Sequence, residues 1–193
     1  TVNWKCHMRP VRDQKSCGSC WAFTTASVME GNWIIKKGGL ADWISTQQLV
    51  DCDTTNSGCG GGWYSGAMNY YKTSKAMTEA TYPYVAYGKT CAYDATKALA
   101  INNSGYSYNY NADMIYAKLA EGPVAVAVDA NYSWYSYASG IFNDYCDIAV
   151  NHAVTLVGYG TDADSGNGYW IIRNSWGTSW GEKGHMRILE NYN

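Results

Sequence analysis

Charged residues are scarce in this chain of 193 residues: they make up 16% of it, below the quarter that is usual for soluble proteins. The net charge is −2 and no basic block occurs, which argues against nucleic acid as a partner. No apolar run approaches the ~18 residues needed to span a membrane. Internal repeats and low-complexity stretches are also absent. We therefore expect one domain or two small lobes that share an interface.

Phenylalanine is nearly absent, with 2 residues against 18 Tyr and 9 Trp. Tyrosine and tryptophan offer a large apolar face with a polar tip, which suits clefts and contact surfaces. Carbohydrate and peptide ligands both fit this bias, so the composition indicates a binding cleft without naming its ligand.

The chain begins at Thr1, without Met, and no signal peptide is visible. We interpret it as a mature form whose targeting segments have been removed, the alternative being a start set by cloning. It contains 7 cysteines, many for a cytosolic enzyme, which favours a secreted (extracellular) or a lysosomal or vacuolar location. Because 7 is odd, one thiol is left unpaired and calls for a reason.

The first half of the chain carries helical patterns. An apolar-rich run without proline predicts a long buried helix over 19–37, with Ser19 as its cap and Gly38 after its end. Shorter helices are expected over 45–50, where the spacing is that of a capping box, and over 66–73.

Strand patterns dominate the second half. After one more short helix, the expected strands follow at 124–128, 149–157, 169–173 and 185–189. This segregation predicts an α+β fold with two lobes and a substrate cleft between them. The proposed division of the single domain 1–193 is a helical lobe of about 10–104 and a β lobe of about 1–9 and 105–193; the short helix, at 112–120, falls in the β lobe.

The strongest local signal is the motif from Cys17 to Trp21, which reads Cys-Gly-Ser-Cys-Trp. Its second cysteine, Cys20, falls in the first turn of the helix expected over 19–37. There, free backbone N–H groups and the positive end of the helix dipole favour the thiolate, which is the nucleophilic form of cysteine. The motif therefore indicates a catalytic cysteine.

Two other uses of paired cysteines fit less well. A redox-active Cys17–Cys20 pair would need a βαβ context, and no buried strand precedes Cys17. A zinc site would need a second close pair, and the spacing of Cys52 and Cys59 suits one poorly. We therefore expect neither a metal nor another cofactor.

Three further residues could complete a catalytic site. His152 follows Cys20 by about 130 residues and is the candidate acid/base. The amide of Asn174 could accept the far N–H of that imidazole and fix its orientation. The amide of Gln14, together with the backbone N–H of Cys20, could donate to an oxyanion. Taken singly, each has an ordinary structural explanation: a strand histidine, a turn asparagine and a surface glutamine.

These segments together resemble the papain-like cysteine peptidases (papain/cathepsin L-like) over nearly the whole chain. The matching segments, in order, are 10–14, 17–23, 45–53, 58–62, 151–160 and 169–184. The resemblance implies a two-lobed fold with a helical left lobe, an antiparallel β-barrel-like right lobe and the active-site cleft between them. It also implies Cys20 as the nucleophile, His152 as the acid/base, Asn174 as its orienting partner and Gln14 as an oxyanion donor.

Substrate contacts are implied by the same resemblance. Two glycines would offer their backbone to an extended substrate. Five further residues would line the pocket for the substrate side chain two residues before the cut. One residue would accept a substrate N–H with its carbonyl, and another would cover the leaving-group side. These residues are Gly61 and Gly62; then Trp63, Tyr64, Ala127, Val150 and Ala153; and finally Asn151 and Trp176.

The resemblance suggests the disulfides Cys17–Cys59 and Cys52–Cys91. In relatives, the cysteine at position 146 bridges to one near the C-terminus, and no cysteine follows it here. This leaves Cys6 and Cys146 to pair with each other.

Some residues depart from the family pattern. Lys15 stands where a glycine usually follows the glutamine, and Thr46 and Gln48 replace acidic residues, which puts a family ion pair with Arg12 or Arg173 in doubt. The chain ends before the tail that supplies the pocket floor in relatives. Bulky Trp63 and Tyr64 favour an apolar preference in that pocket. Two Asn-x-Ser triplets, beginning at Asn102 and Asn131, are candidate glycosylation sites.

We therefore predict a cysteine endopeptidase that works through a thiolate–imidazolium pair and an acyl-enzyme. Its partners would be polypeptide substrates and, before maturation, an inhibitory pro-segment, and we expect a monomer. The alternatives are a peptidase-like protein that no longer cuts, a redox protein, an exopeptidase and a peptide ligase. The segment between Ala127 and His152 is short for the blocking loop of an exopeptidase.

Overall fold

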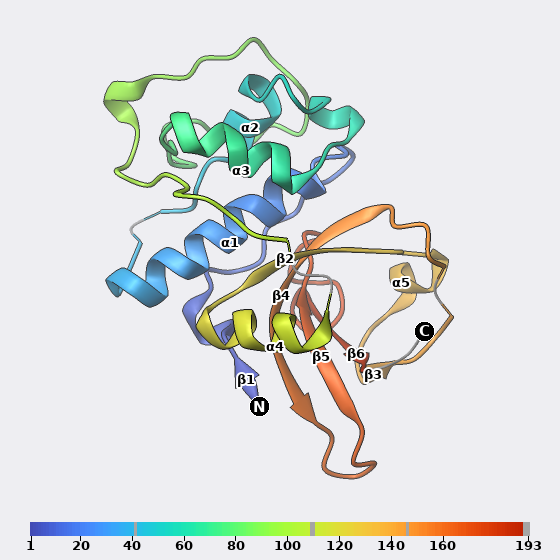
Figure 1. Ribbon diagram of the computed structural model, residues 1–193. Helices are drawn as coiled ribbons and strands as arrows, with labels where there is room; N and C mark the ends of the chain where they lie inside the picture. Colours follow the sequence, from blue (N-terminus) through green and yellow to red (C-terminus); the bar gives the residue numbers. More distant parts are fainter. Residues whose placement is uncertain (41, 109–110, 146, 191–193) are drawn as a thin grey trace.

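The computed structural model describes residues 1–40, 42–108, 111–145 and 147–190. Figure 1 shows helices gathered on one side of the molecule and a sheet on the other. The helices of the first group are α1 (Cys20–Lys37), α2 (Thr46–Cys52) and α3 (Tyr64–Thr73). Short 3-10 turns occur at Lys5–His7, Gly58–Gly60 and Ala95–Lys97. Within the described ranges, no helix is long and apolar enough to cross a membrane.

The long helix predicted over 19–37 is confirmed as α1. Its apolar face, with Trp21 and Ala26 fully buried, packs into the core of the helical side. The helix ends at Gly38, which adopts a left-handed φ of 83° and donates its N–H to Ile34 O. Ser19 occupies the N-cap position, as predicted, but its side chain makes no capping bond and instead lies 2.7 Å from the hydroxyl of Tyr84.

The capping-box helix is also confirmed. Ser45 Oγ accepts a hydrogen bond from Gln48 N at 3.0 Å, and α2 follows directly. The third helix begins at Tyr64, two residues earlier than the predicted 66–73, and ends at Thr73 as predicted. Trp63, which precedes it, has an extended backbone and makes no side-chain capping bond.

The sheet is built around one long strand, β4 (His152–Thr161). One edge of β4 pairs with β5 (Gly168–Arg173), and the other edge pairs with β2 (Val124–Val128) at its start and β1 (Val2–Asn3) at its end. Next to β5 come β6 (His185–Leu189) and β3 (Ile141–Phe142). The register shifts near Gly158, where a Cβ would lie 2.2 Å from Val2 O, so only glycine fits.

The predicted antiparallel, barrel-like lobe needs correction. The pairing of β3 with β6 is parallel, so the sheet is mixed, and the strand order β1-β4-β5-β6-β3 does not close into a barrel within the described residues. The strand expected over 149–157 begins three residues later, at His152. Sequence patterns missed β1 and β3, each of which has only 2 residues.

Two helices accompany the sheet. The predicted helix over 112–120 is α4 (Ala112–Glu121), capped by Asn111 Oδ1, which accepts from Asp113 N at 2.8 Å. The helix α5 (Tyr132–Ser136) was not expected from the sequence. Figure 1 shows α4 lying against β2 and β4.

Separate apolar clusters stabilise the two sides. One joins α1, α2 and α3 and extends to Ile101, while the other joins the sheet to Leu119 and Trp134. The predicted residue bounds of the two lobes stay a prediction.

Buried charged residues lie where the two sides meet. Arg12 contacts Glu30 at 3.3 Å and Glu79 at 3.0 Å, so it has acidic partners, one of them from α1 and neither from the stretch that holds Thr46 and Gln48. Arg173 donates to Pro10 O and to Ser27 Oγ across the same junction. Burial raises the pKa of Glu30, and the neighbouring Arg12 and Arg173 oppose that rise.

Candidate active site

A single open cavity brings the predicted catalytic residues together. It has a volume of about 630 Å³, and its lining includes Cys20, His152, Gln14, Asn151 and Trp176. Cys20 comes from the start of α1 and His152 from the start of β4, so the site lies where the two halves of the chain meet. Asn174 lies behind this surface and reaches the cavity through His152.

The position of Cys20 suits a nucleophile. It is the first residue of α1, where backbone N–H groups have no intrahelical partner and the helix dipole is positive. Its thiol is free and half-buried. Cys17, the other cysteine of the motif, is bonded to Cys59, so a Cys17–Cys20 redox pair is excluded.

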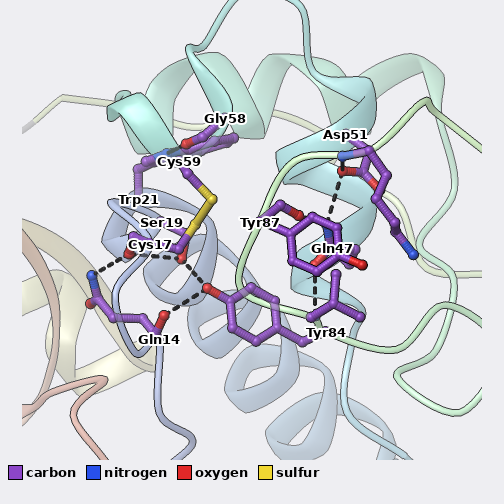
Figure 2. The surroundings of a disulfide bond; sticks show 12 residues. Gln14, Cys17, Ser19, Trp21, Gln47, Asp51, Gly58, Cys59, Tyr84 and Tyr87 are labelled. Carbon is purple, nitrogen blue, oxygen red and sulfur yellow. Dashed lines mark hydrogen bonds between the residues drawn. A yellow bond between two sulfur atoms is a disulfide. The ribbon is translucent and has the colours of Figure 1, made fainter.

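Residues beside this disulfide hold the loop that precedes α1 (Figure 2). Gly18 donates its N–H to Cys59 O at 2.9 Å, and Trp21 Nε1 donates to Gly58 O at 3.1 Å. A Cβ at Gly18 would lie 2.6 Å from Cys59 O, so the close approach requires glycine here. The start of α1 is thus fixed against the segment that carries Gly61 and Gly62.

The tautomer of His152 follows from its partner. Nε2 lies 2.8 Å from Asn174 Oδ1, and the same oxygen accepts from Ser175 N at 2.8 Å, which identifies it as oxygen rather than nitrogen. Nε2 is therefore the protonated nitrogen, and Nδ1 is left for chemistry in the cavity.

Aromatic rings enclose the imidazole. Trp176 stacks on His152 with ring centroids 5.1 Å apart, and Trp134 approaches the same ring edge-on at 6.3 Å. Burial lowers the pKa of His152 below its ordinary value, and the hydrogen bond to Asn174 partly offsets this by favouring the charged ring. A thiolate beside the ring would favour the charged form further.

The side chain of Gln14 is buried and held at both of its polar atoms. Its Nε2 donates to Cys17 O at 3.0 Å, and its Oε1 accepts from Ser175 Oγ at 2.6 Å. One N–H of Nε2 is then left to face the cavity. Ser175 therefore links Gln14 to Asn174, a role that its position next to Asn174 could have signalled but that the sequence analysis missed.

Gly61 and Gly62, which were predicted to offer backbone to the substrate, form a wall that is held in place by the side chain of Asn56. Asn56 Oδ1 accepts from Trp63 N at 2.7 Å, and Asn56 Nδ2 donates to Asp53 Oδ2. A Cβ at Gly62 would lie 2.3 Å from Asn56 Oδ1, so this position has room only for glycine. Gly61 has a φ of 112°, which also favours glycine, and Gly62 and Trp63 are exposed to solvent.

A second, mostly apolar cavity of about 550 Å³ lies beside this wall. It brings together Trp63, Tyr64, Ala127 and Val150, as the sequence predicted for a side-chain pocket. Ala153 does not line it. This residue is buried, although it pairs with Ala127 across β2 and β4 and so lies on the same face of the sheet. The lining residues that sequence patterns missed include Met68, Tyr106, Ile115 and Lys118.

Asn151 and Asn131 form hydrogen bonds near the cavity. Asn151 donates its backbone N–H to Val128 O, and its side chain accepts from Ala130 N and donates to Asp129 Oδ1. The side chain of Asn131 caps α5, and its Nδ2 donates to Tyr145 O; glycosylation at this residue stays a prediction.

Two disulfides match the prediction, Cys17–Cys59 and Cys52–Cys91. Cys6 is instead a free, exposed thiol whose Sγ lies 3.2 Å from His7 Nδ1. This differs from the predicted Cys6–Cys146 bridge, whose second residue lies outside the described residues. No cluster of His, Cys, Asp or Glu in the described part of the chain could hold a metal ion.

Known proteins share this sequence pattern and structure. Residues 1–193 match the family described as "Papain family cysteine protease". The chain is 39% identical to "Digestive cysteine proteinase 3" of Homarus americanus over 98% of this chain and 61% of that protein. It is 41% identical to "Senescence-specific cysteine protease SAG12" of Arabidopsis thaliana over 97% of this chain and 56% of that protein.

Solved structures agree with this match. The bromelain protease from Ananas comosus, in complex with the E64 inhibitor, superposes with a TM-score of 0.89 at 37% identity over 98% of this chain and 89% of that one. Digestive procathepsin L 3 of Tenebrio molitor superposes with a TM-score of 0.91 at 38% identity over 99% of this chain and 64% of that one.

The chain belongs to the papain family of cysteine proteases. It spans 61% and 56% of the length of the two curated relatives named above.

Proposed function

We propose that this chain is a cysteine endopeptidase that hydrolyses peptide bonds in proteins. The observation that supports this most directly is that Cys20 and His152 line one open cavity while Asn174 holds the far side of the imidazole. A nucleophile, a base and an orienting group are thus assembled from separate elements, as nucleophilic catalysis requires.

The mechanism follows from this placement. Nδ1 of His152 takes the thiol proton, and the Cys20 thiolate attacks the substrate carbonyl carbon. The oxyanion that forms is stabilised by Gln14 Nε2 and the backbone N–H of Cys20. His152 then protonates the departing amine and leaves an acyl-enzyme on Cys20. Water, activated by His152, frees the acid and restores the thiol.

Substrate would lie extended along Gly61 and Gly62, with its N–H donating to the carbonyl of Asn151. The side chain two residues before the cut would enter the apolar cavity lined by Trp63, Tyr64, Ala127 and Val150. Trp176, stacked over His152, would cover the leaving-group side.

The decisive test replaces Cys20. We expect Cys20→Ala to abolish hydrolysis of a mixed fluorogenic peptide library while the unfolding midpoint stays unchanged. Cys6→Ala is the matched control, because Cys6 is the other free cysteine in the described residues and lies outside the cavity. Hydrolysis by a verified Cys20→Ala protein would refute the proposal.

A second measurement distinguishes an active peptidase from a peptidase-like protein that binds peptides without hydrolysing them. The bromelain structure similar to this chain holds the E64 inhibitor, so the same thiol-directed probe should label Cys20 here and stop hydrolysis in proportion to labelling. Labelling without any hydrolysis by the unlabelled protein would favour the binding role instead.

Partners and location follow from the same family. We propose polypeptide substrates and, before maturation, an inhibitory pro-segment, as the similarity to procathepsins supports. We also propose that the protein is a monomer. A secreted or a lysosomal or vacuolar location fits the two disulfides.

A further inference from the structure

The hydroxyl of Tyr84 reaches the loop that carries the oxyanion donor. It donates to the backbone carbonyl of Gln14 at 2.8 Å and lies 2.7 Å from Ser19 Oγ (Figure 2). Tyr84 is not among the residues that line the catalytic cavity, so we place it behind the substrate-binding surface. We propose that Tyr84 is a positioning residue that fixes the Gln14 amide for oxyanion stabilisation, an inference that rests on the proposed peptidase activity.

Proton counting fixes the direction of these bonds. A tyrosine hydroxyl has one proton, and here it is given to Gln14 O. The Ser19 hydroxyl must then donate to the Tyr84 oxygen, which at 2.7 Å is closer than its alternative acceptor, Cys17 O, at 3.4 Å. The resulting chain runs from Ser19 through Tyr84 to Gln14, and it connects both ends of the loop before Cys20.

The hydroxyl group is itself held in place. The ring of Tyr84 packs edge-on against Phe23 of α1, with centroids 4.9 Å apart. Its backbone N–H donates to Glu79 Oε1 at 2.8 Å, and Glu79 is paired with Arg12. Burial raises the pKa of Tyr84, which keeps the phenol protonated as a donor.

The loop needs such an external contact because of the residue after Gln14. Lys15 has a φ of 54°, a left-handed conformation that is strained for a non-glycine residue. The carbonyl that Tyr84 holds belongs to the peptide unit between Gln14 and Lys15. The same carbonyl also accepts from Cys17 N, at the longer distance of 3.4 Å. Without the shorter bond from Tyr84, the peptide unit can shift to relieve Lys15, and the Gln14 side chain would shift with it.

Two further contacts on Gln14 come from the opposite side of the cleft. Ser175 accepts from Gln14 N at 2.8 Å and donates to Gln14 Oε1. Tyr84 belongs to the helical side and Ser175 to the segment after β5. Gln14 is therefore clamped between the two sides, and removing one clamp should loosen its amide rather than unfold the protein.

The test uses Tyr84→Phe, which removes the hydroxyl and keeps the ring against Phe23. Tyr82→Phe is the matched control, because Tyr82 is a nearby, buried tyrosine whose hydroxyl is also hydrogen-bonded, here to Asp51 Oδ2, away from Gln14. Two reactions of Cys20 are compared: hydrolysis of a peptide amide, which forms an oxyanion, and alkylation by iodoacetamide, which does not.

For Tyr84→Phe we expect kcat to fall about 3- to 10-fold, the loss of one ordinary hydrogen bond, with KM within about twofold. The alkylation rate should stay at the wild-type value. In a Gln14→Ala background, adding Tyr84→Phe should lower kcat by less than twofold, because the group being positioned is gone. Tyr82→Phe should leave both reactions unchanged.

Three results would overturn the inference: wild-type kcat in Tyr84→Phe, an equal loss in alkylation, or an undiminished loss in the Gln14→Ala background. Failure of the peptidase proposal looks different, because then the wild-type protein itself would not hydrolyse peptides or Cys20→Ala would still do so.

Discussion

The amide oxygen of Asn174 lies 2.8 Å from Nε2 of His152 and closes the far side of the imidazole. The two residues lie in and just after neighbouring strands, β4 and β5, so the sheet sets their separation. The Asn174 Nδ2 atom is buried and has no hydrogen-bond partner among the residues described. Asn174 thus orients His152 by accepting a hydrogen bond at its Oδ1, and this role can be tested directly.

Asn174→Ala should lower kcat about 10- to 100-fold, the loss of one hydrogen bond to a charged ring. Because that bond raises the pKa of His152, its removal should also move the alkaline limb of the kcat/KM profile to lower pH. Asn32→Ala is the control: its amide donates to Pro123 O, outside the catalytic cavity. A pH profile that keeps its wild-type position in Asn174→Ala would contradict the assigned role.

Pocket preference follows from the apolar cavity beside Gly61 and Gly62. Peptides with leucine two residues before the cut should exceed alanine peptides in kcat/KM by about 10- to 100-fold, since each buried methylene is worth about 0.8 kcal/mol. Ala127→Leu, which fills the cavity, should shrink this ratio. Ala95→Leu, at an exposed site, should leave it unchanged; equal rates for both peptides in the wild-type protein would refute the assignment.

Lys15 carries a testable backbone strain. Its φ of 54° predicts that Lys15→Gly raises the free energy of unfolding by up to about 1 kcal/mol in urea denaturation. The same change at Lys36, an exposed position within α1, should lower it by up to about 1 kcal/mol. A loss of stability at both positions would show that Lys15 is not strained.

His185 should make stability depend on pH. Burial, with Arg173 and Lys5 adding to the effect, lowers its pKa to about 4. Nδ1 lies 3.2 Å from Lys183 O, and Nε2 is buried with no partner in the described part of the chain, so added charge would be unsatisfied. The unfolded chain binds the proton first as pH falls, so stability drops between about pH 6.5 and 4, by roughly 3 kcal/mol.

His185→Asn removes the titrating group and keeps an amide donor near Lys183 O, so its unfolding free energy should be flatter over that range. His7→Asn, at an exposed position, should keep the steep profile. Equal slopes for the wild-type protein and His185→Asn in chemical denaturation at several pH values would rule out this explanation.

Local patterns predicted much of the helical side correctly. The helix from Cys20 to Lys37 follows from an uninterrupted apolar run closed by Gly38, and the helix after Ser45 follows from its capping spacing. Such signals lie within a few residues of one another, so the sequence displays them without tertiary context. The two disulfides and the catalytic candidates came from the resemblance instead.

The sequence predictions failed where contacts with distant segments of the chain determine the local structure. Ser19 has the right residue type for a cap, but Tyr84 competes for its hydroxyl. The two-residue strand β3 gains its pairing from β6, and the start of β4 is set by β2. Ala153 was assigned to the pocket but does not line it, although its partner Ala127 does. Directly paired residues of antiparallel strands share one face of the sheet, so the difference depends on how the surrounding side chains bury Ala153, which no local pattern reveals.

The sequence by itself determined the helix that starts at Cys20, the candidate histidine and the family, because these depend on residue type and order along the chain. Only the tertiary structure decided that Glu30 pairs with Arg12, that Ser175 and Tyr84 hold Gln14 from opposite sides, and that Cys6 is free. Contacts of this kind join residues far apart in the chain, and their energies depend on distances and burial that exist only after the two sides have packed together.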